Sequence, residues 1–295
     1  MAVLKVNNLY KNYGRIKALN GISFSVPEGS VYGILGPNGS GKTTLLGIIM
    51  NVLKASGGSY ELFDQQPVDD HRKQIGTLLE TPNFYPYLSA VQNLKIAASI
   101  KERGVEDIDN VLEIVNLSQR KKSAFSTYSL GMKQRLAIAS ALLGSPGVLV
   151  FDEPTNGLDP VGIAEIRALI KKLAKQGKTI IMASHLLDEV EKVCTHVAIL
   201  KQGNIVASGN VDEIFVHEDI VEIGASDPEK LHSVLLGMNG FKKLLQEDNY
   251  FHLYYLSGQA RLDEINKYCF EKGITLSHLH LKKRSLESKF FALTS

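Results

Sequence analysis

Apolar and polar residues follow two different periods along this chain, and each period predicts a type of element. Apolar residues in Val3–Tyr10 indicate an opening strand, and Ile22–Val26 alternates between apolar and polar as a half-buried strand does. The largely apolar runs Val31–Leu35 and Ile75–Glu80 also predict strands. In Val148–Phe151 every residue is apolar, which is typical of a strand buried on both faces of a parallel sheet.

The middle of the chain has helical spacing instead. Apolar residues recur at that spacing in Leu88–Gly104 and Val105–Leu117, and a third helix is expected from Ser129 to about Gly144. These segments predict a helical insertion at about residues 88–144. Beyond it, helices and strands alternate, which indicates an α/β fold. The elements expected there are Gly162–Lys175, Thr179–Ala183, Leu186–Cys194, Val197–Leu200 and Ile205–Ala207.

The order of elements changes near Phe215–Asp219, where we expect a domain boundary. The chain would then consist of a larger domain over residues 1–216 and an accessory domain over 217–295. The expected order in the accessory domain is strand, helix, strand, strand, helix, strand, which predicts a small α+β domain. Its strands are expected at Asp219–Ile223, Lys242–Gln246, Tyr250–Leu256 and Thr275–Leu281, and its helices at Asp227–Leu236 and Ala260–Lys272.

Composition and charge narrow the classes of function. The chain has 295 residues, of which 44% are hydrophobic, enough for the core of one large domain or two. Its 33 Lys and Arg residues nearly balance 31 Asp and Glu residues, so charge predicts no binding to nucleic acid or to a membrane surface. Cys194 and Cys269 lack the spacing of a metal site or disulfide framework, which fits a reducing cytoplasm. We see no signal-peptide pattern and no apolar run near the ~20 residues of a membrane span, so work at a membrane would require a second, spanning chain.

The segment GPNGSGKT, at Gly36–Thr43, is the strongest chemical signal. It lies between an expected strand and an apolar helical segment, and it fits the phosphate-binding pattern G-x-x-x-x-G-K-[ST] at every fixed position. In such a loop the backbone N–H groups turn toward phosphate oxygens, and the following helix adds the positive end of its dipole. Lys42 is expected to reach the outer phosphates, and the Thr43 hydroxyl to bind a magnesium ion. The turn Ser56–Ser59 is expected to end this unit.

Two carboxylates at the end of the buried strand form the second signal. Asp152 and Glu153 follow Val148–Phe151 directly, at the strand edge where open α/β sheets bind ligands. Asp152 is placed to hold a magnesium ion through water. Glu153 is one residue further on, points elsewhere, and is suited to orient or deprotonate an attacking water. The alternative is a solvated turn with two acids, and the phosphate loop makes that the weaker interpretation.

A third segment, Tyr128–Leu136, reads YSLGMKQRL and lies between the first two motifs. Ser129 is a good N-cap for the helix that follows, and Gly131 permits a close approach of the backbone. Alone, this segment is an ordinary start of a helix. Because of its position between a phosphate loop and an Asp–Glu strand, the chain resembles the ATP-binding-cassette (ABC) ATPases over about residues 3–215.

The resemblance covers several motifs in the family's order. GPNGSGKT resembles Walker A, VLVFDEP resembles Walker B with the catalytic glutamate, and YSLGMKQRL resembles the signature motif. The segment 156–159 resembles the D-loop, 183–185 resembles the switch histidine, and Tyr13 resembles the aromatic residue that stacks on adenine. The resemblance implies ATP and Mg²⁺ as ligands and assigns the following residues to the site. The catalytic residues are Glu153, His185 and Lys42; the ATP contacts are Tyr13, Gly36, Pro37, Asn38, Gly39, Ser40, Gly41, Lys42, Thr43, Thr44, Ser129, Gly131 and His185; the metal site is Thr43, Glu80 and Asp152; and the D-loop is Gly157, Leu158 and Asp159.

Two departures from the family pattern indicate which branch of the family the chain resembles. In the signature, Leu130 replaces the first glycine of L-S-G-G-Q and Met132 replaces the glutamine, whereas the serine and the second glycine remain. Glu80 stands where most of the family has glutamine. Both features, and the ending SLESKFFALT, resemble exporters similar to bacitracin and lantibiotic self-resistance pumps.

The resemblance further implies a site shared between two copies. Ser129 and Gly131 of a second copy, or of a homologous chain, would face the ATP held by the first copy. Closure on two ATP molecules would then push on separate, polytopic permease subunits at the cytoplasmic side of the membrane. The contact with the permease is expected at residues 80–87 and the helical insertion, and the cargo would be a drug, peptide or lipid-like molecule.

Two other functions are weighed against the exporter. A soluble ABC ATPase of DNA repair or translation is disfavoured, because the chain has no long coiled-coil insertion, no zinc cysteines and no second cassette. A nucleotide sensor without turnover is disfavoured, because the catalytic residues named above are all present. The pair His278 and His280 is interpreted as two positions on one face of a strand and not as a metal site.

Overall fold

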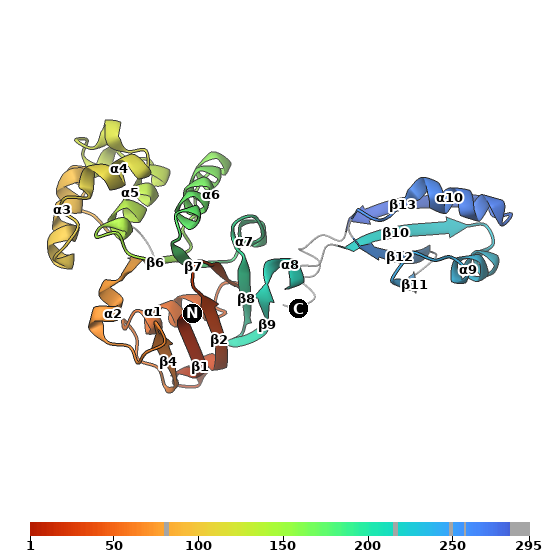
Figure 1. The fold of residues 1–295 in the computed structure, drawn as a ribbon, viewed down its shortest axis with the longest axis horizontal. Helices are drawn as coiled ribbons and strands as arrows, with labels where there is room; N and C mark the ends of the chain where they lie inside the picture. Colours follow the sequence, from red (N-terminus) through yellow and green to blue (C-terminus); the bar gives the residue numbers. More distant parts are fainter. Residues whose placement is uncertain (80–82, 215–217, 248–249, 257, 284–295) are drawn as a thin grey trace. The chain divides into compact units, whose positions relative to one another are not determined.

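The structure is a computed structural model that describes residues 1–79, 83–214, 218–247, 250–256 and 258–283 (Figure 1). The chain divides into two compact units, and the N-terminal unit ends at Ile214. Each unit has its own sheet and its own hydrophobic core.

A six-stranded sheet forms the centre of the N-terminal unit, in the order β5-β6-β7-β3-β8-β9. Five of its strands are parallel, and β9 is antiparallel at one edge. Every residue of β3, β6 and β7 is buried, as the continuous apolar runs predict for inner strands covered on both faces. The strands are β3 (Val31–Leu35), β5 (Ile75–Leu78), β6 (Val148–Asp152), β7 (Thr179–Ser184), β8 (His196–Lys201) and β9 (Asn204–Asn210).

A second, antiparallel sheet has the order β2-β1-β4. It consists of β1 (Ala2–Tyr13), β2 (Ile16–Pro27) and β4 (Gly57–Leu62). The sequence predicts that Ser56–Ser59 ends the phosphate-loop unit and does not predict the strand that begins within this segment: Gly57 is the first residue of β4, which pairs with β1. The pattern hides this strand, since it opens with two glycines, which are rare in strand interiors.

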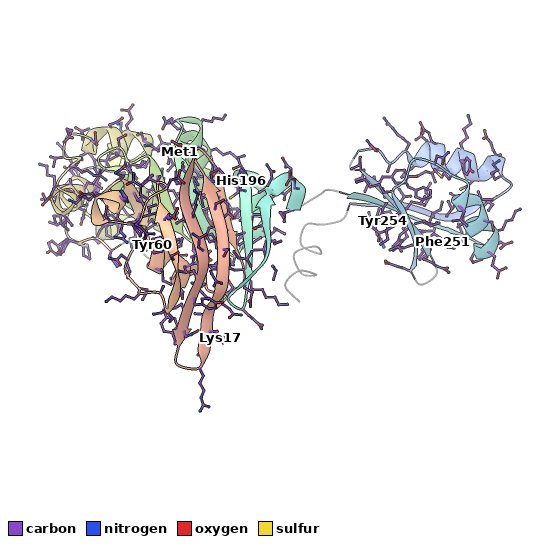
Figure 2. All side chains as sticks on the ribbon, turned by 60° about the horizontal axis from the view of Figure 1, so that its bottom comes forward. Met1, Lys17, Tyr60, His196, Phe251 and Tyr254 are labelled. Atoms are coloured by element: carbon purple, nitrogen blue, oxygen red, sulfur yellow. The ribbon has the colours of Figure 1, made fainter. Side chains whose placement is uncertain are left out.

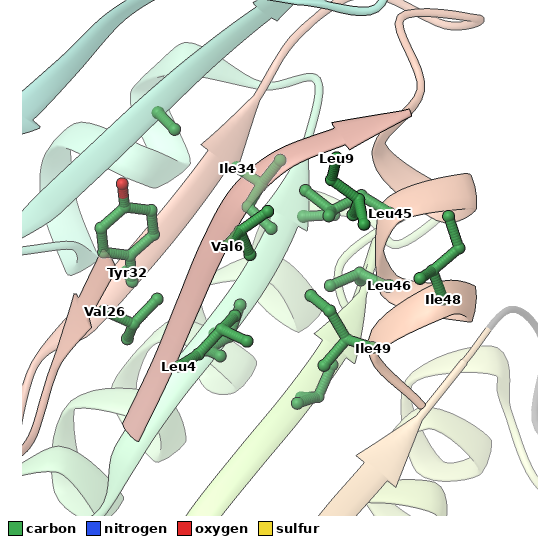
Figure 3. Close-up of a cluster of buried hydrophobic side chains, with 14 of the residues drawn as sticks. Leu4, Val6, Leu9, Val26, Tyr32, Ile34, Leu45, Leu46, Ile48 and Ile49 are labelled. Carbon is green, nitrogen blue, oxygen red and sulfur yellow. The ribbon is translucent and has the colours of Figure 1, made fainter. Parts of the chain in front are cut away.

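The main core of this unit lies where β1, β3 and helix α1 (Lys42–Ile49) meet (Figure 3). Leu4 and Leu9 from β1, Ile34 from β3, and Leu45 and Ile49 from α1 are all fully buried there. Burying side chains of this size stabilises a fold by about 1.5–3 kcal/mol each. The helix that follows the phosphate loop is therefore held between the two sheets.

Helices of the expected insertion pack on one another and against the edge strand β5. Ser89 opens α3 with a capping box, in which its hydroxyl and the Gln92 side chain each pair with the other's backbone N–H. The helices of this unit are α2 (Asp69–Lys73), α3 (Ala90–Lys101), α4 (Ile108–Ile114), α5 (Leu130–Leu142), α6 (Pro160–Lys175), α7 (Leu187–Val193) and α8 (Val211–Ile214), with 3-10 turns at Ser118–Arg120 and Phe125–Thr127. Within the described ranges, no helix combines the length and the apolar character needed to cross a bilayer.

The C-terminal unit has the strand and helix order expected from the sequence. Its antiparallel sheet has the strand order β11-β12-β10-β13, and residues of helices α9 and α10 join one buried cluster with one face of that sheet. Because strand residues alternate between faces, Phe251 of β12 lies in this core and Tyr254 on the opposite face (both labelled in Figure 2). The elements are β10 (Glu218–Ala225), α9 (Pro228–Leu236), β11 (Lys243–Glu247), β12 (Tyr250–Leu256), α10 (Leu262–Glu271) and β13 (Leu276–Lys283).

The face of this sheet that carries Tyr254 also carries a polar network around Glu222. The Glu222 carboxylate accepts hydrogen bonds from His252 Nε2 at 3.0 Å, from His278 Nε2 at 2.8 Å and from the Lys282 ammonium. The Lys282 ammonium, with the two imidazoles, lowers the pKa of Glu222 to about 2 despite its burial. His278 is thus a partner of a buried carboxylate.

We expect acid to weaken the C-terminal unit as the pH falls from about 4.5 toward about 2. Folding lowers the pKa of Glu222 from 4.5 to about 2. The ionised carboxylate therefore stabilises the folded unit fully above pH 4.5, and this stabilisation is lost as the pH falls through about 2. Hydrogen exchange of the β10 and β12 amides, corrected for the intrinsic rates, should show falling protection over this range. Glu222→Gln should flatten that dependence, and the exposed Glu271→Gln should leave it intact; an unchanged pH profile in Glu222→Gln would contradict the assignment.

Candidate functional site

The phosphate-loop segment follows β3 and ends at the first turn of α1. Its first N–H, on Gly36, donates to the Ser184 carbonyl at the end of β7, at 3.2 Å. The N-cap of α1 is Gly41, with φ 109° and no side-chain cap. Since no side chain satisfies the first N–H groups of α1, they are available to an anion in the loop.

Two glycines allow this loop to press against its neighbours. A Cβ atom at Gly36 would lie 2.4 Å from the Leu200 carbonyl oxygen of β8, and one at Gly41 would lie 2.4 Å from the Ala18 carbonyl oxygen of β2. Neither distance can hold a carbon atom, and both clashing atoms belong to backbone. The loop therefore packs closely between β8 of one sheet and β2 of the other, and these tertiary contacts fix its conformation.

Lys42 folds back over the loop that precedes it. Its Nζ donates to the Gly36 carbonyl at 2.8 Å and to the Pro37 carbonyl at 3.2 Å, and the residue is 5% exposed. The hydroxyl of Ser40 is buried and has no hydrogen-bond partner within the described part of the chain. A buried hydroxyl of this kind fits a ligand that accepts hydrogen bonds, as phosphate oxygens do.

Asp152 and Glu153 lie at the carboxyl end of β6, beside this loop. Asp152 is 2% exposed and shares a face of β6 with Val148 and Val150, which belong to the core around α1. Glu153 has a positive φ of 48° and its N–H donates to the Ala183 carbonyl at 3.1 Å. A positive φ is uncommon for glutamate, and this backbone conformation turns its side chain away from the direction that the strand would give it.

Two of the predicted site residues, Lys42 and His185, converge on the carboxylate of a third, Glu153. Glu153 Oε1 lies 3.3 Å from Lys42 Nζ, and Glu153 Oε2 lies 2.8 Å from His185 Nδ1. A carboxylate only accepts hydrogen bonds, so His185 Nδ1 carries the proton and donates. In the neutral imidazole this leaves Nε2 as an acceptor. The predicted catalytic residues therefore form one contiguous group, with Glu153 and His185 at the ends of β6 and β7 and Lys42 in the first turn of α1.

The remaining predicted ATP contacts occupy two other places. Tyr13 is half-exposed at the end of β1, with Lys11 Nζ 4.9 Å from its ring, and the same hairpin touches the loop at Ala18. Ser129 caps α5, where its Oγ accepts from the Met132 N–H at 3.3 Å. Ser129 and Gly131 lie at the exposed start of α5, whereas Lys42 is buried against the loop.

The predicted D-loop connects the catalytic group to α6. The Asp159 carboxylate caps α6 by accepting from the Gly162 N–H at 2.9 Å. Gly157 has a φ of 75°, in the left-handed region that glycine favours. Of the predicted metal ligands, Thr43 is exposed in the first turn of α1, and Glu80 lies outside the described residues.

Sequence reasoning missed one buried carboxyl near this site. Glu189 on α7 is 3% exposed, and burial raises the pKa of its carboxyl. The signal was available: Glu189 lies at helical spacing from Leu186 and Val193, so it falls on the apolar face of this helix. It belongs to the helix that follows His185.

The chain matches known proteins over most of its length. A family model described as "ABC transporter" matches residues 19–156. The bacitracin transport ATP-binding protein of Enterococcus faecalis is 34% identical over 298 residues, which cover 99% of this chain and 96% of that protein. A lantibiotic transport ATP-binding protein of Streptococcus pyogenes is 36% identical over 99% of its own length but only 75% of this chain. Among solved structures, a dimeric ATP-binding cassette with ADP and phosphate matches 70% of this chain and 98% of its own, with a TM-score of 0.63 and 28% identity.

We expect Gly36→Ala to destabilise the N-terminal unit. The added methyl group would meet the Leu200 carbonyl at 2.4 Å, and relieving that contact means moving backbone, at a cost of about 1–3 kcal/mol. Gly147→Ala is the matched control, because nothing lies within 4 Å of the added carbon. Chemical denaturation followed by circular dichroism measures both. Equal stability of the two variants would show that the loop does not pack in this way.

Proposed function

This chain belongs to the ABC transporter family as one of its ATP-hydrolysing, ATP-binding chains, and we propose that it powers an exporter by closing with a second copy on two ATP molecules. The named relatives are transport proteins for bacitracin and for a lantibiotic, and we propose for this chain a cargo that is a drug, peptide or lipid-like molecule. The resemblance to the bacitracin protein runs through both units, which supports the same use of the whole chain.

The observation that carries the proposal is the convergence of Lys42 and His185 on Glu153. In the proposed reaction, Glu153 takes a proton from water while the water oxygen bonds to the terminal phosphorus of ATP. The bond between that phosphorus and the bridging oxygen breaks, which yields ADP and phosphate. Lys42 stabilises the charge on the phosphate oxygens, and His185 holds Glu153 and the water in place.

A magnesium ion fits the residues beside the loop. Asp152 supplies a buried carboxylate and Thr43 a hydroxyl, both of which are oxygen ligands that Mg²⁺ prefers. Asp152 lies on the face of β6 that packs toward α1, and Thr43 belongs to the first turn of that helix. When bound, the ion neutralises phosphate charge. A third contact from Glu80 is a proposal from the sequence alone.

The second copy is proposed to complete the ATP site with Ser129 and Gly131. The dimeric relative with ADP and phosphate supports this arrangement. Ser129 lies at the exposed N-terminus of α5, a helix of 13 residues, where backbone N–H groups and the helix dipole favour an anion. Tyr13, half-exposed on its hairpin, is proposed to stack on the adenine.

A permease contact is proposed at the groove beside β5 and the helical insertion. The groove has a volume of about 670 Å³. Asn93 fixes the backbone of Tyr85 in the wall of the groove. The Asn93 side chain accepts from the Tyr85 N–H at 2.8 Å and donates to the Tyr85 carbonyl at 3.2 Å. Tyr85 and Tyr87 are 50% and 74% exposed, so they are available to another chain. The residues that line the groove include Thr77, Leu79, Phe84, Tyr85, Asn93 and Ile100.

The proposed location is the cytoplasmic side of the cell membrane, where the chain would be held by permease subunits. We further propose the domain division of residues 1–216 and 217–295, which the separate sheets and cores support. The alternative of a soluble ABC ATPase in DNA repair or translation has less support, because the named relatives act in transport.

Glu153→Gln is expected to bind ATP, to lower kcat by about 10²–10⁴-fold, and to accumulate an ATP-bound dimer, because the amide keeps the shape but removes the base. Phosphate release and sedimentation with ATP measure the two effects. Glu113→Gln, an exposed change on α4, is the control. Wild-type turnover in Glu153→Gln would exclude Glu153 as the base.

Ser129→Arg is expected to block dimer closure and to leave ATP binding by the monomer intact. The side chain is exposed, so the monomer can accommodate arginine, whereas a closely facing second copy cannot. Ser118→Arg, also exposed, controls for the added charge. Equilibrium ATP binding and sedimentation are the measurements. Weaker ATP binding by the monomer would show that Ser129 contacts the ATP of its own copy, which contradicts the proposal.

A further inference from the structure

We propose that Leu130 is a positioning residue, which joins the start of α5 to the D-loop so that the two segments facing a second copy move together. This inference rests on the proposed function, because it concerns the shared ATP site. It assigns a role to a side chain that stands where the family's commonest pattern has glycine.

The geometry is a reciprocal contact between two leucines and two glycines. A Cβ atom at Gly157 would lie 3.2 Å from Leu130 Cδ2, and a Cβ atom at Gly131 would lie 3.9 Å from Leu158 Cδ2. Each leucine therefore lies over the glycine of the other segment. We call these four residues the leucine–glycine interlock.

The exposure of Leu130 indicates that the interlock is not part of the hydrophobic core. Leu130 is 48% exposed, and it lies outside the buried cluster around α1. A half-exposed leucine stabilises the fold less than a buried one, since only part of its surface leaves water. The Gly157 turn lies against the side chain of Leu130. The contact joins two segments that are distant in sequence at the surface where Ser129 is also exposed.

The interlock reaches the catalytic group through the backbone. The Asn156 N–H donates to the Glu153 carbonyl at 3.1 Å, and the Leu158 N–H donates to the Thr155 carbonyl at 3.2 Å. The D-loop is thus a short, hydrogen-bonded extension of the Glu153 turn. A displacement of Glu153 is passed to Leu158, and through Leu130 to the neighbouring Ser129.

The interlock would couple the two ATP sites of the proposed dimer. Glu153 serves the ATP of its own copy, whereas Ser129 serves the ATP of the facing copy. The backbone hydrogen bonds of the D-loop and the apolar contacts of the interlock together couple the first residue to the second. A glycine at position 130 has no side chain to cross the gap, so the two segments would adjust independently.

The first test uses the full chain without nucleotide. Leu130→Gly should speed hydrogen exchange of the Asn156 and Leu158 amides by about three- to tenfold, because the turn loses its cover. Leu130→Met, which keeps the volume, should exchange like the wild type. Val161→Ala removes another exposed apolar side chain, 67% exposed at the start of α6, and should have no effect on these amides. Unchanged exchange in Leu130→Gly overturns the interlock.

The second test measures coupling. Leu130→Gly should lower kcat by about five- to tenfold with ATP binding by the monomer unchanged, and should lower the ATP-bound dimer fraction in the Glu153→Gln background. Faster exchange with an unchanged kcat overturns the positioning role. Leu158→Ala, which removes the reciprocal leucine, should reproduce the loss of kcat if Leu130→Gly folds poorly.

The failure of the proposed function is distinguishable from the failure of this inference. If Glu153→Gln alone forms no ATP-bound dimer, the shared site is refuted, and with it the role of the interlock in that site. The exchange difference between Leu130→Gly and Leu130→Met, measured without nucleotide, would still be present in that case.

Discussion

The Glu153 carboxylate lies between the Lys42 ammonium and the His185 imidazole, and the surrounding structure is arranged to keep it there. Lys42 comes from the helix after β3, Glu153 from the end of β6 and His185 from the end of β7. Because β3, β6 and β7 are parallel, their carboxyl ends meet at one edge of the sheet. The strained backbone at Glu153 is held by its hydrogen bond to the Ala183 carbonyl. Strand register thus sets the positions of all three side chains.

The phosphate loop depends on contacts with both sheets of the N-terminal unit. The absence of a side chain at Gly36 lets β8 approach, and the same is true of Gly41 and β2. The hairpin that touches the loop also carries Tyr13, so the proposed adenine and phosphate contacts come from parts that pack on each other. The exposed start of α5 forms a different surface, which in our proposal contacts the ATP held by the facing copy. Leu130 ties that surface back to Glu153 through the D-loop.

The C-terminal unit is organised around another carboxylate. Glu222 is buried on the face of the sheet that carries Tyr254, where the Lys282 ammonium compensates for its charge and two imidazoles donate hydrogen bonds to it. Such a network stabilises the unit only while Glu222 is ionised. The bacitracin protein matches 99% of this chain and therefore extends over this unit, whereas the lantibiotic protein matches 75% of the chain.

The sequence by itself determined the chemistry and most of the elements. GPNGSGKT identified the loop because backbone geometry requires those glycines, and the apolar run at 148–151 identified a buried strand that ends in acids. It did not reveal β4, whose glycines weaken a strand pattern, or the contact of Leu130 with Gly157. Only the tertiary structure decided which residues meet, because periodicity reports the neighbours along an element and not those across elements. The convergence of Lys42, Glu153 and His185 arises from strand order, which no local pattern encodes.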